Sequence, residues 1–208
     1  MDKELRDLYN TNNDIIFLLH IGSRIGWTQI KHQSLNRIIY LSKVLYSFIY
    51  EAEPNILDHY HFTSTPAGPI SSIVNSSLIY LQSAEFIVTS DVGLSLEIAP
   101  GQIEKINDDT FDSVKAGKQE WLKAVMLLLG KYGENKVFSF VINDPLYKEN
   151  TDSNSPKEIA FDSSENKTLQ VLKNFKKSFE DSIEDTSTIS KQEYLALYFD
   201  YIFSQIIR

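Results

Sequence analysis

The sequence contains no cysteine, and it has only two tryptophans and two methionines. The absence of cysteine excludes disulfides, thiolate zinc sites and a cysteine nucleophile. No stretch approaches the ~18 consecutive apolar residues that would span a bilayer. The polar start, MDKELRDLYNTNND, also lacks the pattern of a signal peptide. We therefore expect a cytoplasmic protein that does not engage membranes.

The recognised motifs of catalysis are absent as well. The chain has no Gly-rich dinucleotide or phosphate loop, no His-Glu-x-x-His pair and no Gly-x-Ser-x-Gly elbow. His59-Tyr60-His61 is the best metal candidate, because alternation on a strand would place both imidazoles on one face. Two partly exposed histidines beside a turn are the favoured interpretation. We predict no enzyme activity, no cofactor and no metal site.

Positive charge is scarce on this chain, whose net charge is −8. Residues 1–105 carry 7 Lys and Arg against 11 Asp and Glu, and residues 106–208 carry 13 against 17. Neutralisation of phosphates by Lys and Arg supplies most nucleic-acid affinity, so the balance argues against DNA binding. The candidate phosphate contacts form a local basic grouping, Arg24, Lys31, Arg37 and Lys43.

Hydrophobic periodicity in residues 1–105 predicts a winged helix-turn-helix domain. Asn12-Asn13-Asp14 resembles a cap for a helix from Ile15 to Arg24. A second helix, starting at Thr28 or Ser34 and ending near Tyr50, is apolar on two faces, which is typical of a central helix.

A third helix and a hairpin complete this predicted domain. Apolar residues recur with helical spacing from Ile70 to Leu81, after the Gly68-Pro69 corner. Two β-rich runs between Phe86 and Pro100 flank Asp91-Val92-Gly93, which predicts a β-hairpin wing. The third helix has no Lys or Arg, whereas a helix that reads DNA usually has them. We expect its outer face to contact protein.

Residues 106–208 predict a helical C-terminal region, so that the whole chain is α+β and mostly helical. We expect helices at Phe111–Tyr132 and Thr168–Ser182, a short strand at Lys136–Ile142, and a polar loop near residues 148–167.

The last helix is apolar almost all round and follows a capping box, Ser190 with Glu193. Such a helix is either buried or docked on a partner. The candidate partner-binding residues on it are Tyr194, Leu197, Tyr198 and Tyr201.

Several segments together resemble a prokaryotic family pattern. They are LNRIIYLSKVLYSF (Leu35 to Phe48), HFTSTPAGPISSIVNSSLIYL (His61 to Leu81), EFIVTSDVGLSLEI (Glu85 to Ile98) and the later NDPLY (Asn143 to Tyr147). Panacea-domain antitoxins share the winged-helix part. The set as a whole resembles the middle components of ABC-three component systems, including Lamassu-type anti-phage operons.

This resemblance implies a non-enzymatic subunit that bridges an SMC/Rad50-like ATPase and an effector, often a nuclease. The subunit would restrain the effector until foreign DNA is sensed, and DNA would touch it only indirectly or weakly. Two alternatives stay open: a winged-helix DNA-binding regulator, and a Panacea-type antitoxin that neutralises a toxin by direct contact.

Overall fold

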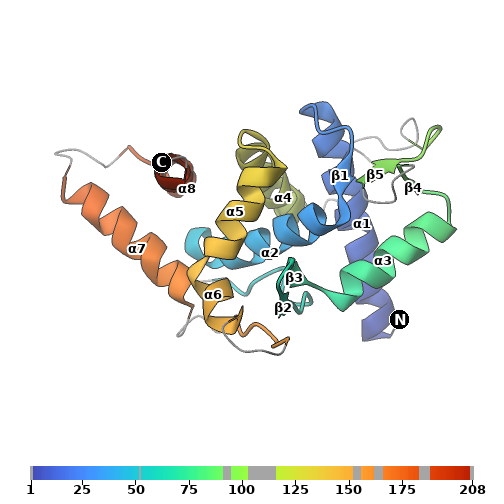
Figure 1. The fold of residues 1–208 in the computed structure, drawn as a ribbon, viewed down its shortest axis with the longest axis horizontal. Helices are drawn as coiled ribbons and strands as arrows, with labels where there is room; N and C mark the ends of the chain where they lie inside the picture. Colours follow the sequence, from blue (N-terminus) through green and yellow to red (C-terminus); the bar gives the residue numbers. More distant parts are fainter. Residues whose placement is uncertain are drawn as a thin grey trace.

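The structure is a computed structural model that describes residues 2–51, 53–90, 95–102, 116–151, 156–161, 166–182 and 188–206. Across these residues the fold is α+β and mostly helical, as predicted, with small antiparallel sheets (Figure 1). None of the helices described is long and apolar enough to cross a bilayer. The elements in chain order are α1 (Lys3–Arg24), β1 (Ile30–Lys31), α2 (His32–Ile49), β2 (Thr63–Thr65), β3 (Gly68–Ile70), α3 (Ser72–Ser83), β4 (Ile87–Thr89), β5 (Ser95–Ile98), α4 (Ala116–Gly130), α5 (Glu134–Asn143), α6 (Pro145–Thr151), α7 (Lys167–Glu180) and α8 (Lys191–Ile206).

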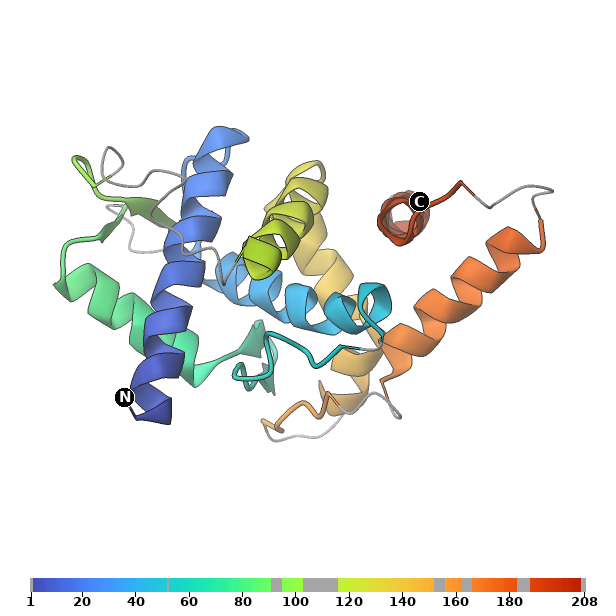
Figure 2. The same ribbon diagram turned by 180° about the vertical axis from the view of Figure 1, so that it is seen from behind.

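Helix α2 lies at the centre of the fold, and both of its apolar faces are covered. Nearly every residue from Ser34 to Ile49 is buried. Helices α4, α5, α7 and α8 all contact α2, and Figures 1 and 2 show it running lengthwise through the molecule. One hydrophobic cluster therefore joins residues of both predicted domains, such as Leu45, Trp121 and Phe199. The predicted boundary at residue 105 lies outside the described residues.

The predicted hairpin is present as β4 and β5, and a third strand extends it. Ile87 lies opposite Ile98, and Thr89 lies opposite Leu96. Strand β1 pairs with the other edge of β5, which gives the order β1-β5-β4. The Asp91-Val92-Gly93 turn lies outside the described residues. Because β1 leads directly into α2, this sheet fixes the start of the central helix.

A second hairpin, β2–β3, wraps a buried arginine. Gly68 has φ +120°, in the left-handed region that favours glycine, and a Cβ there would lie 3.1 Å from Nε of Arg37. The Arg37 guanidinium donates to the carbonyl oxygen of Ala67 at 2.6 Å and lies 4.3 Å from the centre of the Phe138 ring. The Gly68-Pro69 corner is thus needed for close packing around this cation.

The first helix starts earlier than predicted. It begins at Lys3, so the expected capping residues, Asn12-Asn13-Asp14, lie inside it. The Asp14 carboxylate is buried, accepts a hydrogen bond from the Tyr60 hydroxyl at 2.8 Å and pairs with Lys118 at 2.7 Å. Since these distant donors satisfy the side chain, Asp14 does not need to cap a helix end.

The predicted strand at Lys136–Ile142 is wrong, because this segment is helix α5. Its buried residues, Val137, Phe140 and Val141, have the spacing of one helical face, which packs on α2 and α8. The β-rich composition is overridden by this packing.

The described residues of the polar loop predicted near residues 148–167 include regular structure. Helix α6 extends to Thr151. Beyond it, the Ile159 amide donates to the Phe62 carbonyl oxygen, and the Ser64 amide donates to the Lys157 carbonyl oxygen, both at 2.8 Å. The segment therefore pairs with the chain around β2.

Asp144 of the Asn143–Tyr147 motif forms a buried junction between α2, α6 and α7. Its carboxylate accepts hydrogen bonds from the Tyr40 hydroxyl at 2.8 Å, the Thr168 hydroxyl at 2.7 Å and the Tyr147 amide at 3.1 Å. The side chain is 1% exposed, and this burial raises the pKa of Asp144. The motif is therefore structural.

We expect Asp144→Ala to lower the free energy of unfolding by about 3 kcal/mol, because it leaves the Tyr40 and Thr168 hydroxyls buried without an acceptor. Urea unfolding followed by circular dichroism measures the change. Asp181→Ala, at an exposed position, is the matched control and should change the free energy by less than about 0.5 kcal/mol. Equal changes in unfolding free energy for the two substitutions would contradict the stabilising role of Asp144.

Candidate protein-interaction surfaces

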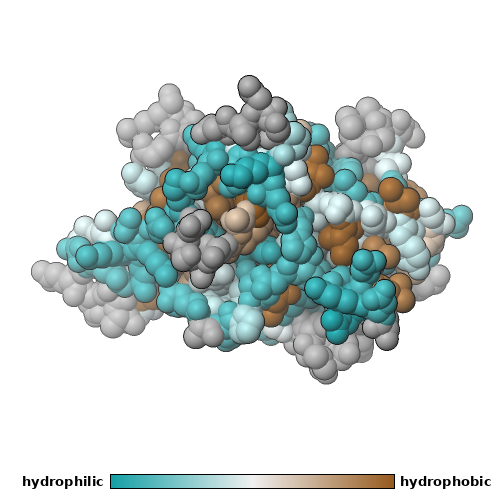
Figure 3. Space-filling model, turned by 90° about the horizontal axis from the view of Figure 1, so that it is seen from below, coloured by the Kyte–Doolittle hydropathy of each residue, from teal (hydrophilic) through white to brown (hydrophobic). Residues whose placement is uncertain are grey.

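Helix α3 presents an uncharged outer face. Its buried stripe consists of Val74, Ser77, Leu78 and Leu81. On the other side Ile79 is 66% exposed and Tyr80 is 52% exposed, and no residue of the helix is charged. Figure 3 shows hydrophobic atoms reaching the surface among hydrophilic ones. Exposed apolar side chains without nearby charge are characteristic of the centre of a protein interface.

Ile79 and Tyr80 were not among the predicted partner-binding residues. The signal in the sequence is weak, because Ile79 and Tyr80 adjoin Leu78 and Leu81 in one apolar run. Only the direction of the helix relative to α1 and β4, which it contacts, decides which members of the run face outward.

The four predicted partner-binding residues of α8 divide into two pairs. Tyr194 and Tyr198 are buried, against Phe179 and Phe175 of α7 respectively. Leu197 is 36% exposed and Tyr201 is 51% exposed. The first pair therefore holds α8 on the protein, and only the second pair is available to a partner. The capping box is present, since Ser190 and Glu193 exchange hydrogen bonds.

The structure does not assemble the four predicted phosphate contacts into one exposed patch. Arg37 and Lys43 are buried, at 7% and 5% exposure. The Lys43 ammonium donates to the carbonyl oxygens of Tyr60 and Asp58, at 2.7 and 3.3 Å, and burial lowers the pKa of this group. Arg24 and Lys31 are exposed, and Lys31 lies 3.7 Å from a carboxylate oxygen of Glu134.

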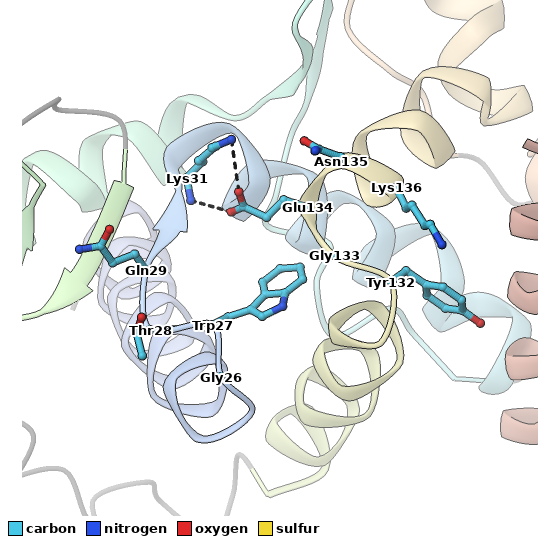
Figure 4. Close-up of a pocket in the computed structure, with 10 residues that line it drawn as sticks. All are labelled: Gly26, Trp27, Thr28, Gln29, Lys31, Tyr132, Gly133, Glu134, Asn135 and Lys136. Carbon is cyan, nitrogen blue, oxygen red and sulfur yellow. Dashed lines mark hydrogen bonds and ion pairs between the residues drawn. The ribbon is translucent and has the colours of Figure 1, made fainter. Parts of the chain in front are cut away.

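A cleft of about 560 Å³ separates the α1–β1 turn from the α4–α5 turn (Figure 4). The Trp27 ring points into it, while Tyr132 and Lys136 point away toward α8. Glu134 crosses the cleft by accepting a hydrogen bond from the Lys31 amide at 2.8 Å. The Glu134 carboxylate also pairs with the Lys31 ammonium. Polar contacts therefore join the two halves of the chain across the cleft.

The two histidines of the candidate metal pattern have different surroundings. His59 is half-buried, and its Nε2 atom has no hydrogen-bond partner. His61 is exposed, and its Nδ1 atom lies 3.2 Å from Glu158. Within the described residues, no group of three or more His, Asp or Glu side chains is arranged to hold a metal ion. Burial, reinforced by the charge of Lys118, lowers the pKa of His59 to about 4.

Comparison of this chain with family models, curated proteins and solved structures yields no match.

His59 should make the stability of the protein depend on pH. Its folded-state pKa of about 4 lies below the ordinary value of 6.5, so the unfolded chain binds a proton in this window and the folded chain does not. We expect the free energy of unfolding to fall as the pH is lowered from 6.5 toward 4. Urea unfolding at pH 7 and pH 5 should show that His59→Gln loses less unfolding free energy between these two pH values than the wild type does. An equal loss of unfolding free energy in both proteins would contradict the lowered pKa of His59.

Proposed function

We propose that this chain is a non-enzymatic, winged-helix interaction subunit. The topology supports the assignment: α1, β1, α2 and α3 are followed by the β4–β5 wing, with β1 at the far edge of β5. One departure is the segment of residues 50–71 between α2 and α3, which carries β2–β3 where helix-turn-helix proteins have a turn of three or four residues.

The uncharged outer face of α3 carries the proposal. In a winged helix that reads DNA, this helix would enter the major groove and present Arg or Lys to phosphates and guanines. Here it presents Ile79 and Tyr80 among serines. Arg37 and Lys43 are buried and donate to backbone carbonyl oxygens inside the fold, which further weakens the case for a DNA-binding regulator.

We further propose that the subunit bridges an SMC/Rad50-like ATPase and an effector nuclease in an anti-phage complex. The family resemblance of the sequence motivates this role. The geometry supports it, because a bridge needs two separate surfaces. Helices α3 and α8, which carry the two surfaces, lie toward opposite ends of the molecule in both ribbon views (Figures 1 and 2).

Substitutions on the two surfaces should separate the two contacts. We expect Ile79→Ser with Tyr80→Ser to abolish co-purification with one product of the neighbouring genes, and Leu197→Ser with Tyr201→Ser to abolish it with another. Loss of central apolar anchors weakens binding by at least about tenfold. Co-expression, affinity purification and titration by calorimetry measure this.

The control is Ile56→Ser, which removes a side chain that is 37% exposed and lies away from both surfaces in sequence; it should leave both contacts intact. A monodisperse monomer that binds neither ATPase nor effector would refute the bridging role. A single small toxin as the bound product would instead favour the antitoxin alternative.

DNA binding has a separate test. We expect no shift of a DNA duplex in a gel at low salt, and no difference between the wild type and Arg24→Ala with Lys31→Ala. Binding that falls steeply with salt and is lost in this variant would show phosphate contacts and favour the regulator.

A further inference from the structure

A groove of about 830 Å³ lies between the start of α1, the segment around residues 58–61 and the start of α3. Figure 3 views the molecule from the side on which α1 begins, where hydrophilic and hydrophobic atoms lie next to one another. The groove borders the α3 face, since Ser72 and Ser76 belong to both.

Negative charge predominates in the groove. Glu4, Asp7 and Asp58 line it, against Lys3 as the single Lys or Arg of the lining. Within the described part of the chain, the carboxylates of Glu4 and Asp7 make no ion pair. Asp58 is 71% exposed and lies 3.7 Å from the buried Lys43. Glu4 and Asp7 therefore favour a cation in the groove, whereas the charges of Lys118 and Lys43 act in the opposite sense on His59.

Two buried polar atoms at the groove have no partner. Ser71 lines it, is fully buried, and its hydroxyl makes no hydrogen bond even though it occupies the cap position of α3. The Nε2 atom of His59, which also lines the groove, is likewise buried and unsatisfied. Buried polar groups are nearly always hydrogen-bonded in native proteins, so these two atoms are the hydrogen-bonding groups that remain for a segment bound against this part of the groove wall.

The lining also has an apolar part. Leu8 and Ile73 are half-buried within it, and the exposed Ile79 and Tyr80 follow farther along α3. A ligand that fits this surface combines a cationic group with apolar side chains, as a basic amphipathic segment of a protein does.

We infer that the α1–α3 groove binds a segment of a partner protein that carries Lys or Arg beside apolar residues. The cation lies against Glu4 and Asp7, and the apolar side chains cover Leu8 and Ile73 and continue toward Ile79. This inference rests on the proposed function in one respect, that the partner of α3 is a protein.

Fluorescence anisotropy with two labelled peptides tests the groove. The first is a short amphipathic peptide of Leu and Arg, and the second is identical except that Glu replaces each Arg. We expect only the arginine peptide to bind, and Glu4→Gln with Asp7→Asn to weaken it about tenfold. The charge-matched control, Glu120→Gln with Asp181→Asn, alters exposed acids elsewhere and should change affinity less than about twofold.

Nuclear magnetic resonance locates the bound peptide. Addition of the arginine peptide should shift the Ser71 amide and the His59 ring resonances. Equal binding of both peptides, equal effects of the groove and control variants, or shifts confined to other residues would each overturn the inference.

The experiments distinguish failure of the bridging role from failure of the groove inference. If Ile79→Ser with Tyr80→Ser still removes one partner subunit while the arginine peptide does not bind, the bridging role stands and the groove inference falls. If the peptide binds in the groove but no neighbouring gene product co-purifies, the bridging role falls instead.

Discussion

The complete burial of α2 is the constraint on which the rest of the structure depends. A helix that is apolar on both faces must be covered on every side, and the elements from α1 to β5 provide only part of the cover seen in the described residues. Helices α4, α5, α7 and α8 complete the cover. Two polar contacts across the halves fix their register: the Trp121 indole donates to the Ser42 carbonyl oxygen at 2.9 Å, and the Tyr40 hydroxyl donates to Asp144. The elements from α1 to β5 and the helices from α4 to α8 therefore share one core.

The burial of α2 also determines where the positive charges carried by this helix lie. Arg37 and Lys43 lie on α2, and once that helix is enclosed their cations need partners inside the protein. Carbonyl oxygens and the rings of Phe138 and Phe161 provide these. Two of the few cations in the first half are thereby withdrawn from the surface, and exposed carboxylates such as Glu4 are left to set the local potential.

The proposed role follows from this distribution of charge and apolar surface. In the winged-helix fold that we propose, α3 occupies the position of the DNA-reading helix, but its outer face has serine, isoleucine and tyrosine instead of cations. Next to it lies the groove for which we infer a basic peptide, lined by Glu4 and Asp7, whose carboxylates make no ion pair among the described residues. At the other end of the molecule, Leu197 and Tyr201 remain exposed although Tyr194 and Tyr198 of the same helix are buried. Each end thus offers a surface of different chemistry.

The sequence by itself determined the elements whose signals are local: the apolar repeat of α2, the helix after Gly68-Pro69, the β4–β5 hairpin and the Ser190–Glu193 cap. It also determined the absence of charge on α3. Only the tertiary structure decided the features that depend on distant partners. Asp14 stays inside a helix because Tyr60 and Lys118 satisfy it, the Val137–Val141 segment is helical because α2 and α8 cover its face, and Arg37 is buried because β2–β3 wraps it. No local pattern contains these partners, since they arrive from segments far away in the chain.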